Sequence, residues 1–259
     1  MLTIVDGNNI VYRAFYGKSG LYDGFKSYLQ PLSEYLIVVF DGEGTNWRKS
    51  IYTDYKGNRG EKDPALSKAL EDVRDWLIKI GVCVVQLSET YDIGVKVQDQ
   101  HEGDDVIASL TARISPHIPV LITSADQDYL QLVGKNVRQN LINNKGNTVV
   151  TQENCKEITG VESHQIVDLK ALVGDKSDNY GGITGIGSKT AIELLNNYQT
   201  FENIYGNLEE LSNGLRRKLL NGKSDGEMCK QLAAMKRDLN LPITREMCKL
   251  SEETILELV

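Results

Sequence analysis

Nine carboxylate residues in the first 180 positions have the type and placement to hold metal ions. Most of them lie where an apolar segment ends or where a helical pattern begins. They are Asp6, Asp41, Glu102, Asp104, Asp105, Asp126, Asp128, Asp175 and Asp178. Two unit charges about 5 Å apart repel by roughly 3 kcal/mol at an effective dielectric constant of about 20, so such a cluster requires cations in order to fold. Carboxylate-only sites favour hard divalent ions and indicate chemistry on phosphate groups.

Two short motifs place several of these acids close together. EGDD at 102–105 opens a helical pattern, and SADQD at 124–128 follows an apolar segment. Acids in the first turn of a helix also complement the helix dipole, by about 0.3–1 kcal/mol each, and this alternative needs no metal. Glu102 and Asp104 flank a glycine and could reach one cation, and the motif holds more acids than capping requires. Both motifs therefore favour metal binding.

A glycine-rich segment follows the acidic motif GDKSDN at 174–179. It reads GGITGIGSKTA from 181 to 191, which permits a tight turn before a helix. Free backbone N–H groups at the start of that helix could bind a phosphate with help from Lys189. The segment is not a P-loop, because Ser188 stands between Gly187 and Lys189. A glycine-rich helical turn without any ligand is the alternative.

A basic run with interleaved aromatic residues lies directly after Asp41. It contains WRK at 47–49 and YKGNR at 55–59. Cations on phosphates and bases stacked on Tyr55 would suit a nucleic-acid strand that passes the metal site. An ordinary solvated loop is the competing interpretation.

The composition is that of an ordinary globular domain, with 41% hydrophobic and 25% charged residues. No apolar run approaches the roughly 20 residues of a membrane span. A net charge of −7, taken alone, argues against a nucleic-acid partner. However, the charge would turn slightly positive without the nine proposed ligands, so the distribution of charge matters more than its sum.

The histidines and cysteines give no sign of nucleophilic catalysis or of a zinc motif. The cysteines are far apart, as expected of reduced thiols in a cytosolic protein. The residues are His101, His117 and His164, and Cys83, Cys155, Cys229 and Cys248.

The hydrophobic pattern alternates short apolar runs with amphipathic stretches, which predicts an α/β fold with a mainly parallel sheet. The predicted strands are 2–5, 35–40, 82–87 and 118–123. The predicted helices are 8–18, 22–33, 64–80, 104–114, 163–173, 188–197, 214–221 and 225–238. We expect a loop or short hairpin at 88–101, and mainly helices beyond 160. In open α/β sheets ligands bind beyond the carboxyl ends of the strands, where Asp6, Asp41 and Asp126 should meet.

Together these segments resemble the 5′-nuclease family, which includes phage flap endonucleases and the 5′→3′ exonuclease domain of bacterial DNA polymerase I. The resemblance runs from residue 2 to about residue 240, and YKGNR is most similar to the phage-type branch. The matching pieces stand in family order: IVDGNNIVYRAF (4–15), VVFDGEG (38–44), YKGNR (55–59), EGDDVIA (102–108), TSADQDYLQLV (123–133), LVGDKSDN (172–179) and GITGIGSKTA (182–191).

The resemblance implies a PIN-like catalytic α/β domain at 1–160, with an arch near 43–63 over the active site. It implies a helical helix–three-turn–helix DNA-binding region at 161–259. Two Mg²⁺ or Mn²⁺ ions would be bound, the first by Asp6, Asp41, Glu102 and Asp104. The second would be bound by Asp126, Asp128, Asp175 and Asp178, with Asp104 between the ions and Asp105 in support.

The same resemblance implies roles for residues outside the carboxylate set. Lys56 and Arg59 would lie near the scissile phosphate with Arg13 nearby, and Tyr55 would stack on a base. The glycine-rich turn would bind the duplex backbone, with K⁺ as a further ion on its carbonyls. Its contact residues would be Gly182, Gly185, Gly187, Ser188, Lys189 and Thr190.

The sequence departs from the family pattern at a few positions. The family often has proline after the DN pair and within the turn, where this chain has Tyr180, Gly181 and Thr184. Glycine replaces the common alanine at Gly103, the arch segment is short, and 88–101 looks inserted. None of these changes removes a carboxylate.

The expected activity is metal-dependent hydrolysis of DNA phosphodiesters, which leaves a 5′-phosphate and a 3′-hydroxyl. Expected substrates are DNA with 5′ ends, flaps or nicks, and RNA primers, during replication and repair. The protein would act as a monomer in the bacterial or phage-infected cytoplasm. A PIN-like ribonuclease and a non-catalytic DNA-junction binder are alternatives. A haloacid-dehalogenase-type phosphatase would need DxD where this chain has Asp6-Gly7-Asn8.

Overall fold

The structure is a computed structural model that describes residues 1–259 except 31, 43–45, 88–94, 98–100 and 144–145. Its centre is a sheet whose seven described strands lie in the order β4-β3-β2-β1-β5-β6-β7. All neighbours pair in parallel except β6 and β7, which are antiparallel. The strands are β1 (Leu2–Asp6), β2 (Tyr35–Phe40), β3 (Cys83–Leu87), β4 (Val95–Val97), β5 (Val120–Ser124), β6 (Val137–Asn143) and β7 (Gly146–Val150). The predicted α/β class with a mainly parallel sheet is confirmed.

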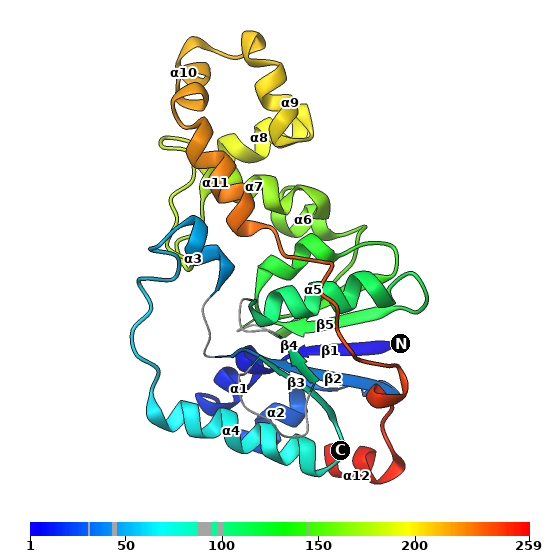
Figure 1. The fold of residues 1–259 in the computed structure, drawn as a ribbon. Helices are drawn as coiled ribbons and strands as arrows, with labels where there is room; N and C mark the ends of the chain where they lie inside the picture. The colour runs from blue at the N-terminus through cyan, green and yellow to red at the C-terminus, as the bar shows by residue number, and fades with distance from the viewer. Residues whose placement is uncertain (31, 43–45, 88–94, 98–100, 144–145) are drawn as a thin grey trace.

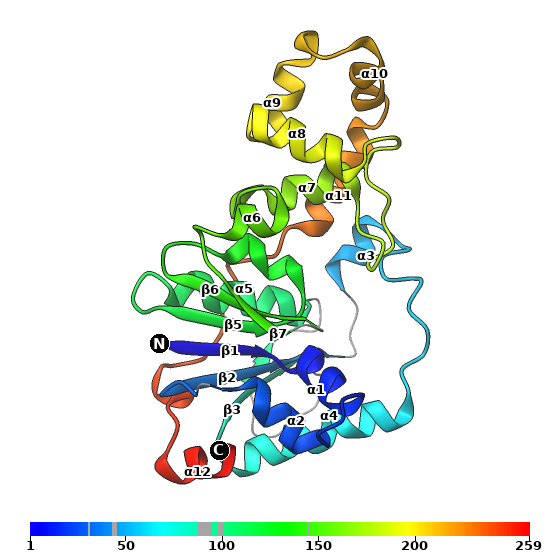
Figure 2. The same cartoon turned by 180° about the vertical axis from the view of Figure 1, so that it is seen from behind.

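Helices cover both faces of the sheet, which explains why β2 is apolar at every position. On one face, α5 (Gly103–Ile114) packs Val106 and Leu110 against the strands. On the other face lie α1 (Gly7–Phe15), α2 (Leu21–Tyr28) and α4 (Pro64–Lys79). Figures 1 and 2 both show α1, α2 and α4 on the side of the sheet away from α5.

A helical region stands beyond the β6–β7 side of the sheet, at the top of Figure 1. Its own apolar core includes Val161, Leu172, Ile183, Leu195 and Phe201. Its elements are α6 (Cys155–Thr159), η2 (Ser163–Gln165), α7 (Ile166–Val173), α8 (Ser188–Tyr198), α9 (Phe201–Gly206), η3 (Leu208–Glu210), α10 (Asn213–Asn221) and α11 (Lys223–Ala233). The short 3₁₀ helix η1 (Gln127–Leu132) connects β5 to β6, and α3 (Trp47–Ile51) lies near α11.

After α11 the chain returns to the sheet, as the orange-to-red segment of Figure 1 shows. Leu241 and Ile243 join the core under α5, and Leu250 N donates to Glu34 O at 3.0 Å beside β2. The segment ends in η4 (Glu246–Cys248) and α12 (Glu252–Leu258), with Leu258 buried on the α4 side of the sheet. The last part of the expected 161–259 helical region therefore packs against the α/β core.

Several sequence-based boundaries were wrong. The helix predicted to reach residue 238 ends at Ala233, because the chain turns there toward the sheet. Strands β6 and β7 and helix α12 were not predicted. Within 88–101 only 95–97 and 101 are described, and β4 pairs with β3 in parallel, so these two strands form no hairpin.

All four cysteines are free thiols. No helix among the described residues has the length and apolarity to cross a membrane.

Candidate metal centre and nucleic-acid interface

Asp6, Asp41 and Asp126 lie at one edge of the sheet because β1, β2 and β5 are adjacent and parallel. Asp6 ends β1 and caps α1, accepting a hydrogen bond from Asn9 N at 3.1 Å. Ser124, at the end of β5, donates to Asp6 Oδ2 at 2.8 Å, which ties the two strand ends together. The carboxyl edge predicted from the sequence is therefore where these side chains meet.

Helix α5 brings Glu102 and Asp104 to the same edge. Its first residue, Gly103, donates its backbone N–H to Asp41 Oδ1 at 2.7 Å. A Cβ at position 103 would stand 2.8 Å from that same oxygen, which is too close for an ordinary contact. Glycine instead of the family's common alanine therefore allows Asp41 to approach the start of α5.

In the first group Asp6, Glu102 and Asp104 are partly buried and Asp41 is exposed. Burial raises the pKa of Asp6 to about 7, with further contributions from Asp104 and Asp41. Burial also raises the pKa of Asp104, while Lys56 opposes the shift. Tyr129 donates a short hydrogen bond to Asp104 and lies 3.5 Å from Asp6 Oδ2. Two neighbouring acids that resist ionisation form a site that a divalent cation would stabilise.

Tyr129 lies in the motif TSADQDYLQLV (123–133), but the sequence analysis did not predict its contact with the metal site. The sequence signal for this role is its position three residues after Asp126, within η1, where its hydroxyl lies beside Asp6 and Asp104. The side chain is 1% exposed.

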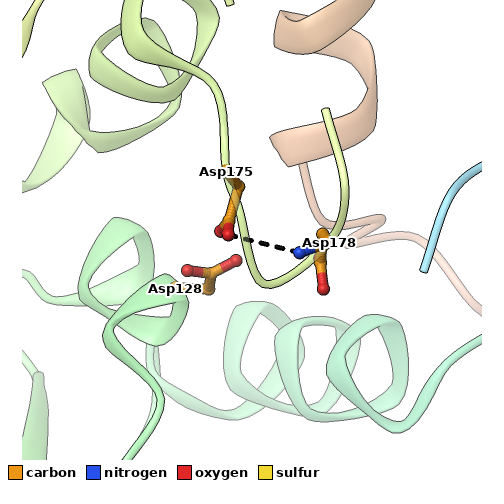
Figure 3. Close-up of side chains that lie close together, drawn as sticks. All are labelled: Asp128, Asp175 and Asp178. Carbon is orange, nitrogen blue, oxygen red and sulfur yellow. Dashed lines mark hydrogen bonds between the residues drawn. The ribbon is translucent and has the colours of Figure 1, made fainter. Parts of the chain in front are cut away.

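Three members of the second group, Asp128, Asp175 and Asp178, lie close together, as Figure 3 shows. One carboxylate oxygen of each lies within 4.8 Å of the other two. Asp178 N donates to Asp175 Oδ1 at 3.3 Å, so the Asp175 carboxylate stabilises the turn at 175–178. Asp126 accepts from Asp128 N at 2.9 Å, and burial followed by repulsion from Asp128 and Asp104 raises the pKa of Asp126. Three convergent carboxylates fit a hard divalent ion.

Lys170 holds this second group together and was missed by the sequence analysis. Its ammonium donates short hydrogen bonds to both Asp128 and Asp175. Burial opposes the charge of Lys170, but Asp128 and Asp175 outweigh it and raise the lysine pKa. Although burial acts against ionisation of Asp175, Lys170 brings its pKa down to about 2. In the sequence, only the position of Lys170 on α7, five residues before Asp175, indicated that it could reach this group.

Asp105 is a correction to the predicted ligand set. Its side chain is fully buried, and Arg48 binds both of its oxygens at 2.9 and 3.0 Å. Trp47 Nε1 and Lys236 N donate to the same carboxylate, each at 2.9 Å. Burial opposes ionisation, but Arg48 and these donors lower the pKa of Asp105. With its oxygens occupied by donors, Asp105 fixes the start of α5 rather than binding metal.

Tyr55 is a second correction. Its ring is 2% exposed and packs with Tyr180, Cys229 and Leu232, so no face is free for a base. Its hydroxyl lies 2.8 Å from Asp178 Oδ2 and 3.0 Å from Glu102 Oε2. The residue therefore links the two carboxylate groups.

Lys56 and Arg59 lie beside the carboxylates, as expected. Lys56 adopts a φ of 55° and donates its backbone N–H to Asp178 O at 3.0 Å. Its ammonium forms a short ion pair with Glu102, and Arg59 Nη2 lies 2.9 Å from Asp178 Oδ1. Arg13 is half-buried in the last turn of α1 and, within the described part of the chain, makes no hydrogen bond to these acids.

The glycine-rich turn lies between α7 and α8. Gly182 and Gly185 have φ values of 63° and 82°, and a Cβ at Gly182 would come within 2.3 Å of Gly174 N. Ile183 and Ile186 are buried beneath the turn, which leaves Gly185 and the residues from Gly187 to Lys189 exposed. The first N–H groups of α8 have no intrahelical acceptors and point out of its N-terminus.

The turn where the K⁺ ion is expected has a lysine side chain beside one of its carbonyl groups. Lys218 on α10 donates to Gly185 O at 3.0 Å, and a Cβ at Gly185 would meet the Lys218 side chain at 3.1–3.3 Å. A protein ammonium group therefore lies at one carbonyl of the turn.

Comparison with known proteins covers both parts of the chain. Residues 1–160 match the family described as the 5′-3′ exonuclease N-terminal resolvase-like domain. Residues 161–255 match the 5′-3′ exonuclease C-terminal SAM fold. The chain belongs to the 5′-3′ exonuclease family.

The relatives of this family member include long and short proteins. It is 35% identical over 271 residues to DNA polymerase I of Caldicellulosiruptor bescii, covering 97% of this chain and 31% of the polymerase. It is 34% identical to a 5′-3′ exonuclease of Aquifex aeolicus, covering 99% of this chain and 89% of the relative. A flap endonuclease Xni of Shewanella frigidimarina is 32% identical, with 98% of both chains covered. The chain thus spans less than a third of the matched polymerase.

Solved structures support the fold. The 5′-exonuclease of T5 with bound zinc has a TM-score of 0.69 and 22% identity, covering 90% of this chain and 88% of that one. The T5 flap endonuclease in complex with DNA and metal ions has a TM-score of 0.70 and 22% identity, covering 99% and 98%.

Proposed function

We propose that this 5′-3′ exonuclease family member hydrolyses phosphodiesters of DNA at 5′ ends, flaps or nicks. The observation that carries the proposal is the convergence of two carboxylate groups at one edge of the sheet. In the second group, oxygens of Asp128, Asp175 and Asp178 lie within 4.8 Å of one another. Family membership and the fold of the T5 nucleases agree with this activity.

The residues divide into two ion-binding groups. Asp6, Asp41, Glu102 and Asp104 would hold one divalent ion, and Asp126, Asp128, Asp175 and Asp178 the other. Mg²⁺ or Mn²⁺ suits these oxygen ligands. When bound, such ions supply a nucleophilic water and stabilise the leaving oxygen. We do not assign K⁺ to the glycine-rich turn, because Lys218 is present there.

Lys56 and Arg59 would bind the scissile phosphate. Their charges now offset Glu102 and Asp178, so they stand beside both ion-binding groups. A phosphate that enters between them would exchange these carboxylate partners for its own oxygens, and the cations would then stabilise charge that develops during cleavage. Tyr55 would act only by orienting Glu102 and Asp178.

Tyr12 and Tyr16, rather than the buried Tyr55, would stack on bases of the DNA. Tyr12 on α1 and Tyr16 directly after α1 are 54% and 56% exposed, and their ring centroids are 4.8 Å apart. Exposed rings beside a phosphate site can stack unpaired bases of any sequence. Arg13, between them, would contact the same strand.

The duplex would lie on the glycine-rich turn, whose contacts are backbone N–H groups and Ser188, Lys189 and Thr190. The division into a catalytic domain at 1–160 and a DNA-binding region from 161, with an arch near 43–63, belongs to this proposal. We also propose that the protein acts as a monomer in a bacterial or phage-infected cytoplasm, and that RNA primers are substrates.

A substrate panel tests the function. Labelled 5′-flap DNA, nicked duplex, closed circular DNA and unstructured RNA are each incubated with Mg²⁺, and cleavage is expected only where a DNA 5′ end exists. Asp126→Asn and Asp175→Asn should abolish cleavage while leaving DNA binding largely intact. Turnover in excess EDTA would refute the metal requirement. Preferential cleavage of unstructured RNA would favour the ribonuclease, and binding without cleavage would favour the junction binder.

A further inference from the structure

Tyr180 has a buried hydroxyl group without a hydrogen-bond partner in the described part of the chain. The residue is only 3% exposed. Most buried polar side-chain atoms in folded proteins are hydrogen-bonded, so an orphaned hydroxyl requires an explanation. A water molecule bound beside the hydroxyl would satisfy it.

The backbone directs this side chain toward the second carboxylate group. Asp175 N donates to Tyr180 O at 2.8 Å, and Tyr180 N donates to Asp175 O at 2.9 Å. The two residues thus form an antiparallel bridge, and side chains of a directly opposed pair project to the same side. The Tyr180 ring therefore lies alongside the Asp175 carboxylate.

Electrostatics give the same placement. Burial raises the pKa of Tyr180, Lys170 opposes this, and Asp128, Asp175 and Asp178 add to it. These are the three acids of the second group and the lysine between two of them. The ring itself is fixed by packing against Tyr55 and Leu232. The hydroxyl thus faces the cluster from a rigid support.

None of the polar groups nearby satisfies the hydroxyl. Lys170 donates to Asp128 and Asp175, and the Tyr55 hydroxyl lies within hydrogen-bond distance of Asp178 and Glu102. The oxygen of Tyr180 is therefore a free acceptor at the edge of a site for a cation.

We propose that the Tyr180 hydroxyl accepts a hydrogen bond from a water molecule carried by the divalent ion of the Asp128–Asp175–Asp178 group. Mg²⁺ and Mn²⁺ bound by few carboxylates keep several waters, and those waters are strong donors. Partners of this kind contribute roughly 10–100-fold to metal affinity. The inference rests on the proposed function, because it assumes an ion in that group.

The test is Tyr180→Phe, which removes the hydroxyl and keeps the ring. Free Mn²⁺ is measured by electron paramagnetic resonance during titration of the DNA-free protein, and thermal unfolding is measured in EDTA. We expect the variant to bind one of its two Mn²⁺ ions about 10–100-fold more weakly. Its metal-free unfolding midpoint should equal or exceed that of the wild type, because an unpaired buried hydroxyl has been removed.

Tyr205→Phe is the matched control. The Tyr205 hydroxyl donates to Leu219 O at 2.9 Å, far along the helical region. Its removal should lower the metal-free midpoint and leave Mn²⁺ affinity unchanged. Wild-type Mn²⁺ affinity in Tyr180→Phe, or a lowered metal-free midpoint, would overturn the inference while the proposed function stands. A wild-type protein that binds no Mn²⁺ would overturn both.

Discussion

Raising the pH of the metal-free protein from about 5 to about 8 should destabilise it, because Asp6 must then lose its proton. The Asp6 carboxyl lies beside Asp104 and Asp41, and burial first and these neighbours second raise its pKa from 3.8 to about 7. Protonation of Asp6 therefore relieves repulsion that would otherwise act within the folded site.

The size of the effect follows from that shift. The folded state binds a proton more tightly than the unfolded chain, so the stabilisation is complete below the unfolded pKa. It is lost as the pH rises through the folded pKa. A shift of about three units corresponds to roughly 4 kcal/mol, and the slope reaches at most about 1.4 kcal/mol per pH unit. The raised pKa values of Asp104 and Asp126 act in the same direction.

Urea unfolding in EDTA, followed by circular dichroism at several pH values, measures this loss. Asp6→Asn should flatten the pH profile, since asparagine does not titrate. Asp23→Asn, on the exposed surface of α2, controls for loss of one negative charge elsewhere. Adding Mg²⁺ or Ca²⁺ should restore stability most at high pH, where the carboxylates are ionised. A metal-free stability that is constant or rises between about pH 5 and about pH 8 would refute the reasoning.

Three further predictions concern the cationic side chains. Arg48→Met should cost about 3–5 kcal/mol in urea unfolding, because it leaves the buried Asp105 without its guanidinium partner; a loss below about 1 kcal/mol would contradict this. Lys56→Ala should slow single-turnover cleavage by about 10²-fold or more with little change in duplex affinity, and an unchanged rate would exclude a catalytic role. Duplex affinity should be equal in K⁺ and N-methylglucamine salts at matched ionic strength, because Lys218 occupies the Gly185 carbonyl. Lys218→Met should bind duplex more weakly, and a wild-type requirement for K⁺ would disprove the assignment.

The sequence predicted the carboxyl edge because its signals are local. An apolar run that ends in Asp6 or at Asp41 defines both a strand and the place where its last side chain emerges. Parallel neighbours then bring those ends together without further information. Strand β6 escaped prediction because Gln139 and Asn140 are buried within it and interrupt the apolar pattern. Gln139 instead donates to Asp126 O, a contact that no periodicity encodes.

Roles that depend on distant partners could not be predicted. Asp104 and Asp105 are adjacent and chemically identical, yet one faces Asp6 and Tyr129 and the other faces Arg48. The difference is that successive residues in the first turn of α5 point in different directions, and the guanidinium arrives from a helix 57 positions earlier. The chain after Ala233 escaped prediction for a similar reason. It is extended, and Arg113 holds it through the carbonyls of Leu241 and Ile243.

Repulsion among the carboxylates is reduced in different ways in the two ion-binding groups. In the second group the Lys170 ammonium forms ion pairs with both Asp128 and Asp175, and the pKa of Asp175 falls to about 2. Asp6 in the first group has no cation in contact among the described residues, and a raised pKa is the result. Metal binding to the first group must therefore release a proton near neutral pH. Binding to Asp128 and Asp175 in the second group must instead displace an ammonium group from the same oxygens, so its affinity should also depend on where Lys170 can move.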